Sequence, residues 1–257
     1  MYKPKQGNIF TDNDYIEYPV SNDLKKMVAC FWWLEPRDNG SFLAIPDACV
    51  DLVFELSSPN RIYLIGSHTK YREFSISHNT KYLGLRFMPG AINNFIDIDL
   101  SFSKNTVIQL DSLGELTINK IISSISILEN KDRCKSQIEE WIRSNLKNNI
   151  INQNVMCVIN EVINKNGEIA LDDSLSATTE LCSRQVRRVV RKLTGLSLKE
   201  ISRIIRFQSA LKKLTEGRNV KVDYGEVFFD QSHMIREFKC FTGFTPKKFI
   251  KMSVLSN

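Results

Sequence analysis

The apolar residues of this chain change their spacing once, near residue 111, and this change limits the folds open to it. Before that point they form short runs rich in β-branched and aromatic residues, separated by turn-forming segments. In residues 81–88 every second position is large and apolar (Leu83, Leu85 and Phe87), as in a strand that buries one face. Several short strands at this spacing predict a small β-barrel or a cupin-like sandwich. The predicted strands are 29–34, 51–56, 61–65, 71–77 and 81–88.

After residue 111 the spacing becomes helical. Apolar residues recur every three or four positions at 116–128 and at 136–146. We expect these two helices to close the first domain, and the polar residues 148–154 to form a hinge. The predicted fold class is therefore α+β, with a β-rich domain at 1–150 and an all-helical domain at 151–257.

Composition excludes several classes of protein. With 42% hydrophobic residues the chain can bury a core, and its longest apolar runs are too short to span a bilayer. The polar first residues do not resemble a secretory signal, so we expect a soluble, cytoplasmic protein with no membrane partner. The six cysteines contain no C-x-x-C pair, and we expect buried thiols, no cofactor and no metal. A metal-binding barrel using His68 and His78 stays open as an alternative.

The charge is distributed unevenly along the chain. Residues 182–257 hold 17 lysines and arginines against 6 acidic residues, a net charge of +11, whereas residues 1–181 carry −5. A basic segment on an otherwise acidic chain points to a polyanionic partner. A lysine-rich solvated surface is the alternative.

Residues 183–194 form the most informative helix of the basic segment. Four apolar residues recur at helical spacing and make one face: Val186, Val189, Val190 and Leu193. Four arginines recur at the same spacing about 200° around the axis, and the helix has no acidic residue to pair with them: Arg184, Arg187, Arg188 and Arg191. Guanidinium groups bind guanine edges and phosphates through two hydrogen bonds at once, so this face suits the major groove of DNA.

Two further helices follow. Residues 198–214 have an almost continuous apolar side, and a helix of this length spans about 25 Å, enough to space two DNA-contacting helices toward the roughly 34 Å between successive major grooves. Asp230 is a suitable N-cap for a helix at 230–242, which Gly243 ends before Pro246 begins another. The predicted outward side of the helix at 230–242 carries Gln231, Ser232, His233, Arg236 and Lys239.

At these residues the sequence resembles the AraC/XylS family of bacterial transcription regulators, over about residues 155–250. Residues 183–188 and Thr194-Gly195-Leu196-Ser197 look like the first recognition helix, and residues 206–211 look like the linker-helix signature. Residues 229–239 and Gly243-Phe244-Thr245-Pro246 look like the second recognition helix and its terminal motif. Residues 46–54 and 84–90 are similar, more weakly, to one class of N-terminal sensor domain in such regulators.

The resemblance implies two helix-turn-helix modules, at about 168–195 and 221–243, joined by a linker helix at 198–214. It implies a nucleoid-associated regulator that binds double-stranded promoter or operator DNA and has no catalytic activity. RNA polymerase, a small-molecule effector and a second copy of the chain are further expected partners. The residues expected to contact DNA are Arg184, Arg187, Arg188, Arg191, Gln231, Ser232, His233 and Arg236.

Some residues depart from the family pattern. Cys182 stands where a serine N-cap is usual, and Ser176 where a buried alanine is usual. Asp223 and Val227 replace a buried alanine and a turn glycine in the second module, and a buried carboxylate is costly unless it is paired. We therefore expect the first module to supply more of the DNA contacts than the second.

Two other functions remain open. A chain with these departures could keep the regulator fold, lose specific DNA reading and act by binding another regulator. An enzyme would use polar groups of the N-terminal domain, for which no catalytic spacing is present: His68, His78, Asp47, Asp51, Glu55 and Arg86.

The N-terminal domain offers three candidate ligand-binding residues. In a strand, neighbouring side chains face opposite sides, so one of Trp32 and Trp33 is expected in the core and the other at a pocket or a dimer surface. Arg86 is the third candidate.

Overall fold

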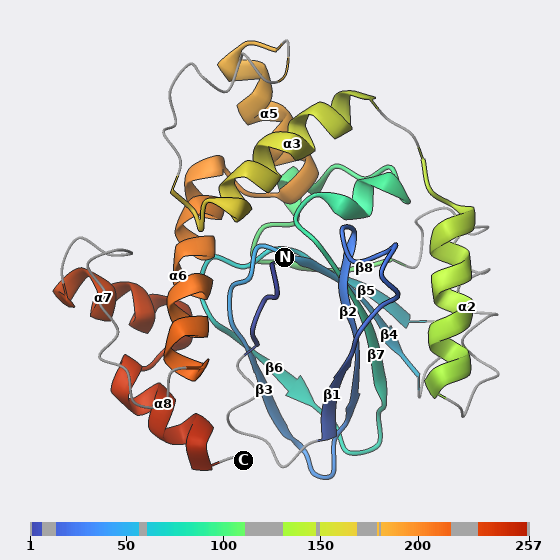
Figure 1. Cartoon of the computed structure of the whole chain (residues 1–257). Coiled ribbons are helices and arrows are strands. Elements are labelled where there is room, and N and C mark those ends of the chain that lie inside the picture. The colour runs from blue at the N-terminus through green and yellow to red at the C-terminus, as the bar shows by residue number, and fades with distance from the viewer. Residues whose placement is uncertain are drawn as a thin grey trace.

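The computed structural model describes residues 2–6, 14–56, 61–110, 131–147, 150–168, 179, 181–216 and 231–255. Antiparallel strands build its N-terminal part, and helices make up most of the chain after residue 131 (Figure 1). The α+β fold class predicted from the sequence is therefore confirmed.

The strands of the described part form two sheets. The larger sheet has the order β1-β2-β7-β4-β5-β8, and β3 pairs with β6 in a second sheet. The strands are β1 (Asp14–Tyr18), β2 (Val28–Glu35), β3 (Gly40–Ala44), β4 (Val50–Glu55), β5 (Arg61–Ile65), β6 (Arg72–Ile76), β7 (Tyr82–Phe87) and β8 (Val107–Gln109). All five predicted strands are present to within about one residue at each end. The sequence predicted either a small barrel or a sandwich. The described strands form two separate sheets, as in a sandwich.

Alternation along the central strands gives the larger sheet two different buried faces. On β7, Leu83, Leu85 and Phe87 enter the main core, while Gly84 and Arg86 face the opposite side. The sequence predicted this alternation correctly, but the second face is not open to solvent, because Gly84 and Arg86 are also buried. Burial of both faces follows from the second sheet, which covers the side that the main core leaves free.

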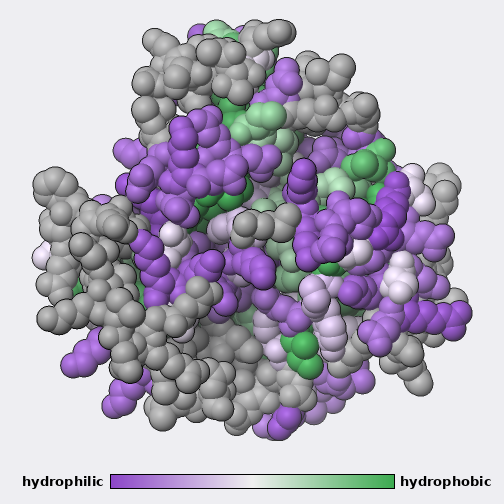
Figure 2. Space-filling view, viewed as in Figure 1, coloured by the Kyte–Doolittle hydropathy of each residue, from purple (hydrophilic) through white to green (hydrophobic). Residues whose placement is uncertain are grey.

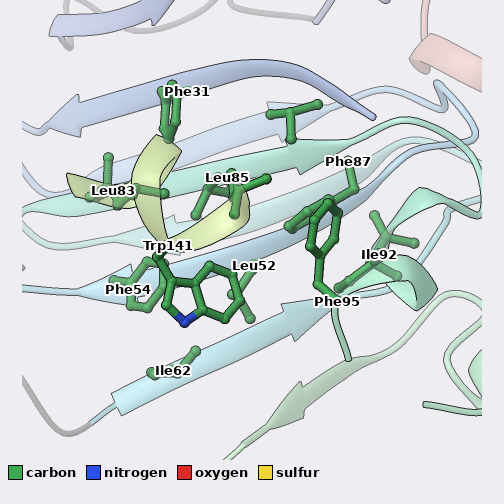
Figure 3. Packing of buried hydrophobic residues seen from close by; sticks show 14 of the residues in the cluster. Phe31, Leu52, Phe54, Ile62, Leu83, Leu85, Phe87, Ile92, Phe95 and Trp141 are labelled. Atoms are coloured by element: carbon green, nitrogen blue, oxygen red, sulfur yellow. The ribbon is translucent and has the colours of Figure 1, made fainter. Parts of the chain in front are cut away.

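The main core lies between the larger sheet and helix α2 (Lys131–Ser144). Figure 3 shows Trp141 of α2 packed close to Leu52 and Phe54 of β4. Phe95, which follows the short helix η1 (Ala91–Asn94), packs between Phe87 and Trp141 with tilted rings, at centre-to-centre distances of 5.7 and 6.4 Å. The apolar side of α2 is thus used inside the domain, so the described part of this helix does not offer that side to a second copy of the chain.

The C-terminal part is helical. Its elements are α3 (Ile150–Asn164), α5 (Ser183–Thr194), α6 (Leu198–Glu216), α7 (Gln231–Thr242) and α8 (Pro246–Leu255). Helices α5, α6, α7 and α8 were predicted, whereas α3 was not: residues 150–154, interpreted as part of a hinge, are its first turn. Val155, Val158, Ile159 and Val162 are completely buried in the helical core, which explains why a helix forms at these asparagine-rich positions.

Helix α5 begins with an unusual cap. Cys182 makes no side-chain cap hydrogen bond, as expected for a poor capping residue. Instead the side chain of Gln185 accepts a hydrogen bond from the backbone N–H of Cys182 at 3.0 Å, which is one half of a capping box.

The two parts of the chain are joined by buried contacts. Ile45 and Ala48, in the loop between β3 and β4, belong to the helical core and not to the sheet core. The side chain of Gln208 on α6 donates to the Pro46 carbonyl at 2.7 Å and exchanges two hydrogen bonds with the backbone of Lys5. Because buried polar groups are costly when unpaired, these bonds hold α6 against the N-terminal domain.

Several sequence predictions lie outside the described residues: the helix at 116–128, residues 169–178 of the first module with Ser176 among them, and Asp223, Val227 and Asp230. Among the described residues, no helix is both long and apolar enough to cross a membrane. In the view of Figure 2 the described surface is mostly hydrophilic, and its hydrophobic areas are small and separate.

A substitution at Gly195 tests how tightly α5 packs against the N-terminal part of the chain. Gly195 ends α5 at φ +75°, and an added Cβ would lie 2.8 Å from the carbonyl oxygen of Leu100 in the short helix η2 (Leu100–Phe102). We expect Gly195→Ala to lower the free energy of unfolding by about 1–3 kcal/mol, because the left-handed conformation and the contact both disfavour a side chain. Chemical denaturation measures this.

Gly40→Ala is the matched control. An added Cβ at Gly40 meets nothing within 4 Å, so its effect should stay within about 0.5 kcal/mol. Equal stability of the two variants would contradict the tight junction at Gly195.

Candidate functional site

The outer face of α5 carries four exposed arginines. Val186, Val190 and Leu193 are buried in the helical core and fix the rotation of the helix, while Val189 is half-buried. The opposite side therefore points to solvent with Arg184, Arg187, Arg188 and Arg191, all of them exposed. The sequence predicted this division of the helix, and the structure places all four arginines on one accessible surface.

Helix α7 presents a smaller polar surface. Ser232 and Arg236 are exposed, His233 is half-buried with Nε2 4.0 Å from a carboxylate oxygen of Glu237, and the side chain of Gln231 lies outside the described residues. Lys239 is exposed one turn further on. This surface carries fewer cationic groups than that of α5.

Helix α6 connects the two surfaces. It runs from the group that contains α3 and α5 to the pair α7 and α8 (Figure 1). Its 19 residues span about 28 Å. At its α7 side, the guanidinium of Arg203 forms an ion pair with Glu237 and lies 4.9 Å from the centre of the Phe241 ring.

Aromatic packing adds to this attachment. Phe207 of α6 contacts Phe238 and Phe241 of α7 at ring distances of 5.3 and 4.7 Å, and Phe249 of α8 contacts Phe238 at 5.4 Å. These rings are buried, so α7 is held on α6 by the same kind of core that holds α5.

A second candidate site lies in the N-terminal domain, between the two sheets. A cavity of about 270 Å³ is bordered by β2, β4, β5 and β7 on one side and by β3 and β6 on the other. Trp32 and Arg86, two of the three candidate ligand-binding residues, line it. Trp33 does not: it lies in the main core, because its side chain leaves β2 on the opposite face.

Arg86 is the centre of a buried charge cluster beside this cavity. Its Nε and Nη2 donate to the two carboxylate oxygens of Asp51, both at 3.1 Å, and its Nη1 donates to Glu17 at 3.0 Å. Asp47 lies 3.3 Å from Nε and also accepts hydrogen bonds from the backbone of Cys49 and the side chain of Gln6. The cluster joins β1, β4, β7 and the loop before β4.

Burial shifts the acid–base behaviour of these groups. It raises the pKa of Asp47 to about 6, against the opposing attraction of Arg86, and it raises the pKa of Asp51 as well. Burial also lowers the pKa of His68, which lines the cavity, to about 4, with the positive charge of Arg72 as a second cause. His68 is therefore neutral at pH 7.

The sequence did not predict that these groups meet. The sequence offered Asp47, Asp51, Glu55 and His68 only as polar groups of a possible enzyme, and their spacing fitted no catalytic motif. The structure brings all four to the cavity. Asp51, Val53 and Glu55 alternate along β4 with residues of the main core. This alternation in the sequence could have shown that the three side chains lie on one face of the strand.

His78, the other histidine of the metal alternative, is not among the lining residues and contacts Asn39. Within the described ranges, no group of three or more His, Cys, Asp or Glu residues is placed to hold a metal ion.

Two different family models match the N-terminal and the C-terminal part of the chain. A family model described as a domain of unknown function (DUF6597) matches residues 16–109. A model described as a helix-turn-helix domain matches residues 175–252. The second match confirms the predicted AraC-type helix-turn-helix region. No curated protein matches the chain significantly.

Solved structures of ToxT from Vibrio cholerae resemble the whole chain weakly. An apo variant from strain SCE256 has a TM-score of 0.40 at 11% identity, covering 98% of this chain and 94% of that one. A 1.65 Å structure of ToxT has a TM-score of 0.40 at 10% identity, covering 94% and 98%. Likeness at this level says nothing of function.

The pKa of Asp47 gives a testable pH dependence. A carboxyl group with a pKa near 6 in the folded state and near 4 when unfolded favours folding below about pH 4 and loses this contribution as the pH rises through 6. Between pH 4 and 7 we expect the native protein to lose stability relative to Asp47→Asn, on the order of 2 kcal/mol. Urea denaturation across this range measures the difference.

Asp97→Asn, at an exposed position, controls for removal of one negative charge. Parallel pH profiles of the native protein and Asp47→Asn would contradict the raised pKa.

Proposed function

We propose that this chain, a DNA-binding transcription regulator with an AraC-type C-terminal domain, reads a specific DNA site with the arginine face of α5. The observation that carries the proposal is the division of α5 into a buried aliphatic side and an exposed side with four arginines. The helix has no acidic residue, so these guanidinium groups have no partner within α5 and are available to phosphates and guanine edges.

A second contact through α7 fits the same proposal. The length of α6, about 28 Å, approaches the roughly 34 Å that separates successive major grooves on one side of DNA. Ser232, His233 and Arg236 would then meet the next groove. With a single exposed arginine among these three, α7 would contribute less to affinity than α5.

The N-terminal domain is proposed to control this reading through a small molecule. The loop between β3 and β4 supplies Asp47 to the cavity and Ile45 and Ala48 to the helical core. A ligand that moves Asp47 would therefore act on the contacts of Gln208 with Pro46 and Lys5. We place a binding function and no catalysis at the cavity. Arg86 engages the carboxylates of Asp47 and Asp51, and Glu55 accepts a hydrogen bond from Tyr63.

RNA polymerase and a second copy of the chain belong to the proposal as partners of the DNA-bound protein. The domain division at about residue 150 also remains a proposal. Helix α3, which begins there, packs with the C-terminal helices.

Loss of single arginines tests the reading face. We expect Arg187→Ala and Arg188→Ala each to weaken binding to the DNA upstream of the chain's own gene by about 1–3 kcal/mol if the arginine contacts a base. An arginine on a phosphate would instead lower affinity for all DNA equally and reduce the salt dependence. Binding titrations against specific and random fragments over a salt series separate the two cases.

Lys26→Ala removes one positive charge from an exposed position of the N-terminal domain and serves as the control. Unchanged DNA affinity in both arginine variants would refute the assignment of the reading face. Equal affinity for specific and random DNA, with no protected site in a footprint, would favour the alternative of a regulator-fold protein that acts by binding another regulator.

Gln208 tests the connection between the domains. Gln208→Ala leaves the buried Pro46 carbonyl without this donor, so we expect the free energy of unfolding to fall by about 1–3 kcal/mol. The amide of Lys5, which donates to Gln208, should exchange its hydrogen faster.

Thr215→Ala on the same helix is the control, because the Thr215 hydroxyl donates to carbonyls of α6 itself. Chemical denaturation and hydrogen exchange read out both variants. Unaltered exchange at Lys5 in Gln208→Ala would show that the bond is not formed in solution.

A further inference from the structure

The cavity between the sheets is walled by aromatic rings. Tyr15 lies 5.9 Å from Trp32 and 5.1 Å from Phe42, measured between ring centres. Further rings line the same space: Tyr63, Phe74 and Tyr82. Aromatic faces are electron-rich, so a wall of this kind attracts a cation as well as an apolar body.

Gly84 fixes the position of the Trp32 ring. An added Cβ at Gly84 would lie 1.9 Å from the indole, so the ring rests directly on the backbone of β7. The indole Nε1 donates to Asp51 at 3.2 Å, which holds the ring in this orientation. The wall is therefore built in advance of any binding, as small-molecule sites usually are.

The charge of the cavity is negative. Asp47, Asp51 and Glu55 line it, and Arg86 is the one lysine or arginine among the described residues that line it. The donors of Arg86 already serve Asp51, Glu17 and Asp47, so its charge is more than balanced. The guanidinium of Arg61 lies 3.9 Å from Glu55 with its side chain 55% exposed, and water screens it. Arg72 adds a positive charge outside the lining, with its guanidinium 5.2 Å from the centre of the Phe74 ring and close enough to act on His68. Among the described lining residues the three carboxylates outnumber Arg86, so the cavity favours a cation over an anion.

His68 adds an unused hydrogen-bond acceptor. It is 9% exposed, and its Nε2 has no hydrogen-bond partner among the described residues. The ring also forms a hydrogen bond with the backbone of Gly66. A neutral imidazole has one donor and one acceptor nitrogen, so Nε2, which has no partner among the described residues, is left as the acceptor. Its edge-on contact with Phe74, at 5.9 Å, holds the ring at the cavity wall. A buried acceptor of this kind calls for a donor on the ligand.

We propose that the cavity binds a small primary or secondary organic ammonium ion with a hydrophobic body. The aromatic rings and carboxylates stabilise the positive charge, and an N–H group of the ligand donates to His68. The cavity volume equals about nine water molecules at roughly 30 Å³ each, which fits one ring with a short chain. The role of this ammonium ion as an effector rests on the proposed function, whereas its binding does not.

Three probes of similar shape test the proposal on the full chain. They are phenethylamine, its trimethylated quaternary analogue and 3-phenylpropionate. Calorimetry and quenching of tryptophan fluorescence measure binding without DNA. We expect phenethylamine to bind and to raise the melting temperature. The quaternary ion, which cannot donate to His68, should bind at least about tenfold more weakly, and the carboxylate should not bind.

Variants then assign the contacts. His68→Phe keeps a ring against Phe74 and removes the acceptor, so phenethylamine should lose at least about tenfold in affinity while the quaternary ion changes little. His78→Phe, at a histidine outside the cavity, is the matched control. Glu55→Gln, at a partly exposed position that does not depend on the packing of His68, should weaken both cations.

Binding of 3-phenylpropionate as tight as that of phenethylamine would overturn the proposal. So would unchanged phenethylamine affinity in both His68→Phe and Glu55→Gln, or no phenethylamine binding up to about 10 mM, where even millimolar affinity would be seen. DNA titrations with and without phenethylamine form a separate arm. If phenethylamine binds and DNA affinity stays constant, the ligand class stands and control by the N-terminal domain fails.

Discussion

The guanidinium of Arg86 holds the N-terminal domain together. A buried cation is tolerated only when carboxylates and hydrogen bonds surround it, and here Asp51, Glu17 and Asp47 come from β4, β1 and the loop before β4. Those contacts fix the strand register on one face of the larger sheet. They also fix the loop whose other side chains, Ile45 and Ala48, enter the helical core. One ion cluster thus constrains the cavity and its connection to the helices.

In the helical part, the division of each helix into a buried and an exposed side determines which residues reach the surface. Buried aliphatic side chains leave α5 only one orientation, and the arginines must then point outward. In α7 the packing of Phe238 and Phe241 on Phe207 has the same effect on a surface with less positive charge. The unequal charge of the two outer faces supports the proposal that α5 contributes more to DNA affinity than α7.

Local patterns were sufficient where one residue spacing dominated. The alternation of Leu83, Leu85 and Phe87 located β7, and the valines of α5 located that helix at its observed bounds. The short strands β1, β3 and β8 were missed because they are polar or brief. The first turn of α3 was misinterpreted because its asparagines resemble a linker, although Val155 and Val158 continue the helical spacing.

The sequence by itself determined the fold class, the four-arginine face of α5 and the two faces of the central strands, because each follows from the spacing of neighbouring residues. Only the tertiary structure decided which groups share the cavity. Asp47 and Asp51 are four residues apart, whereas His68 and Arg86 come from other stretches of the chain, and no local spacing links these two to the pair of aspartates. Their meeting depends on strand order and on the burial of Arg86, which are properties of the whole folded domain.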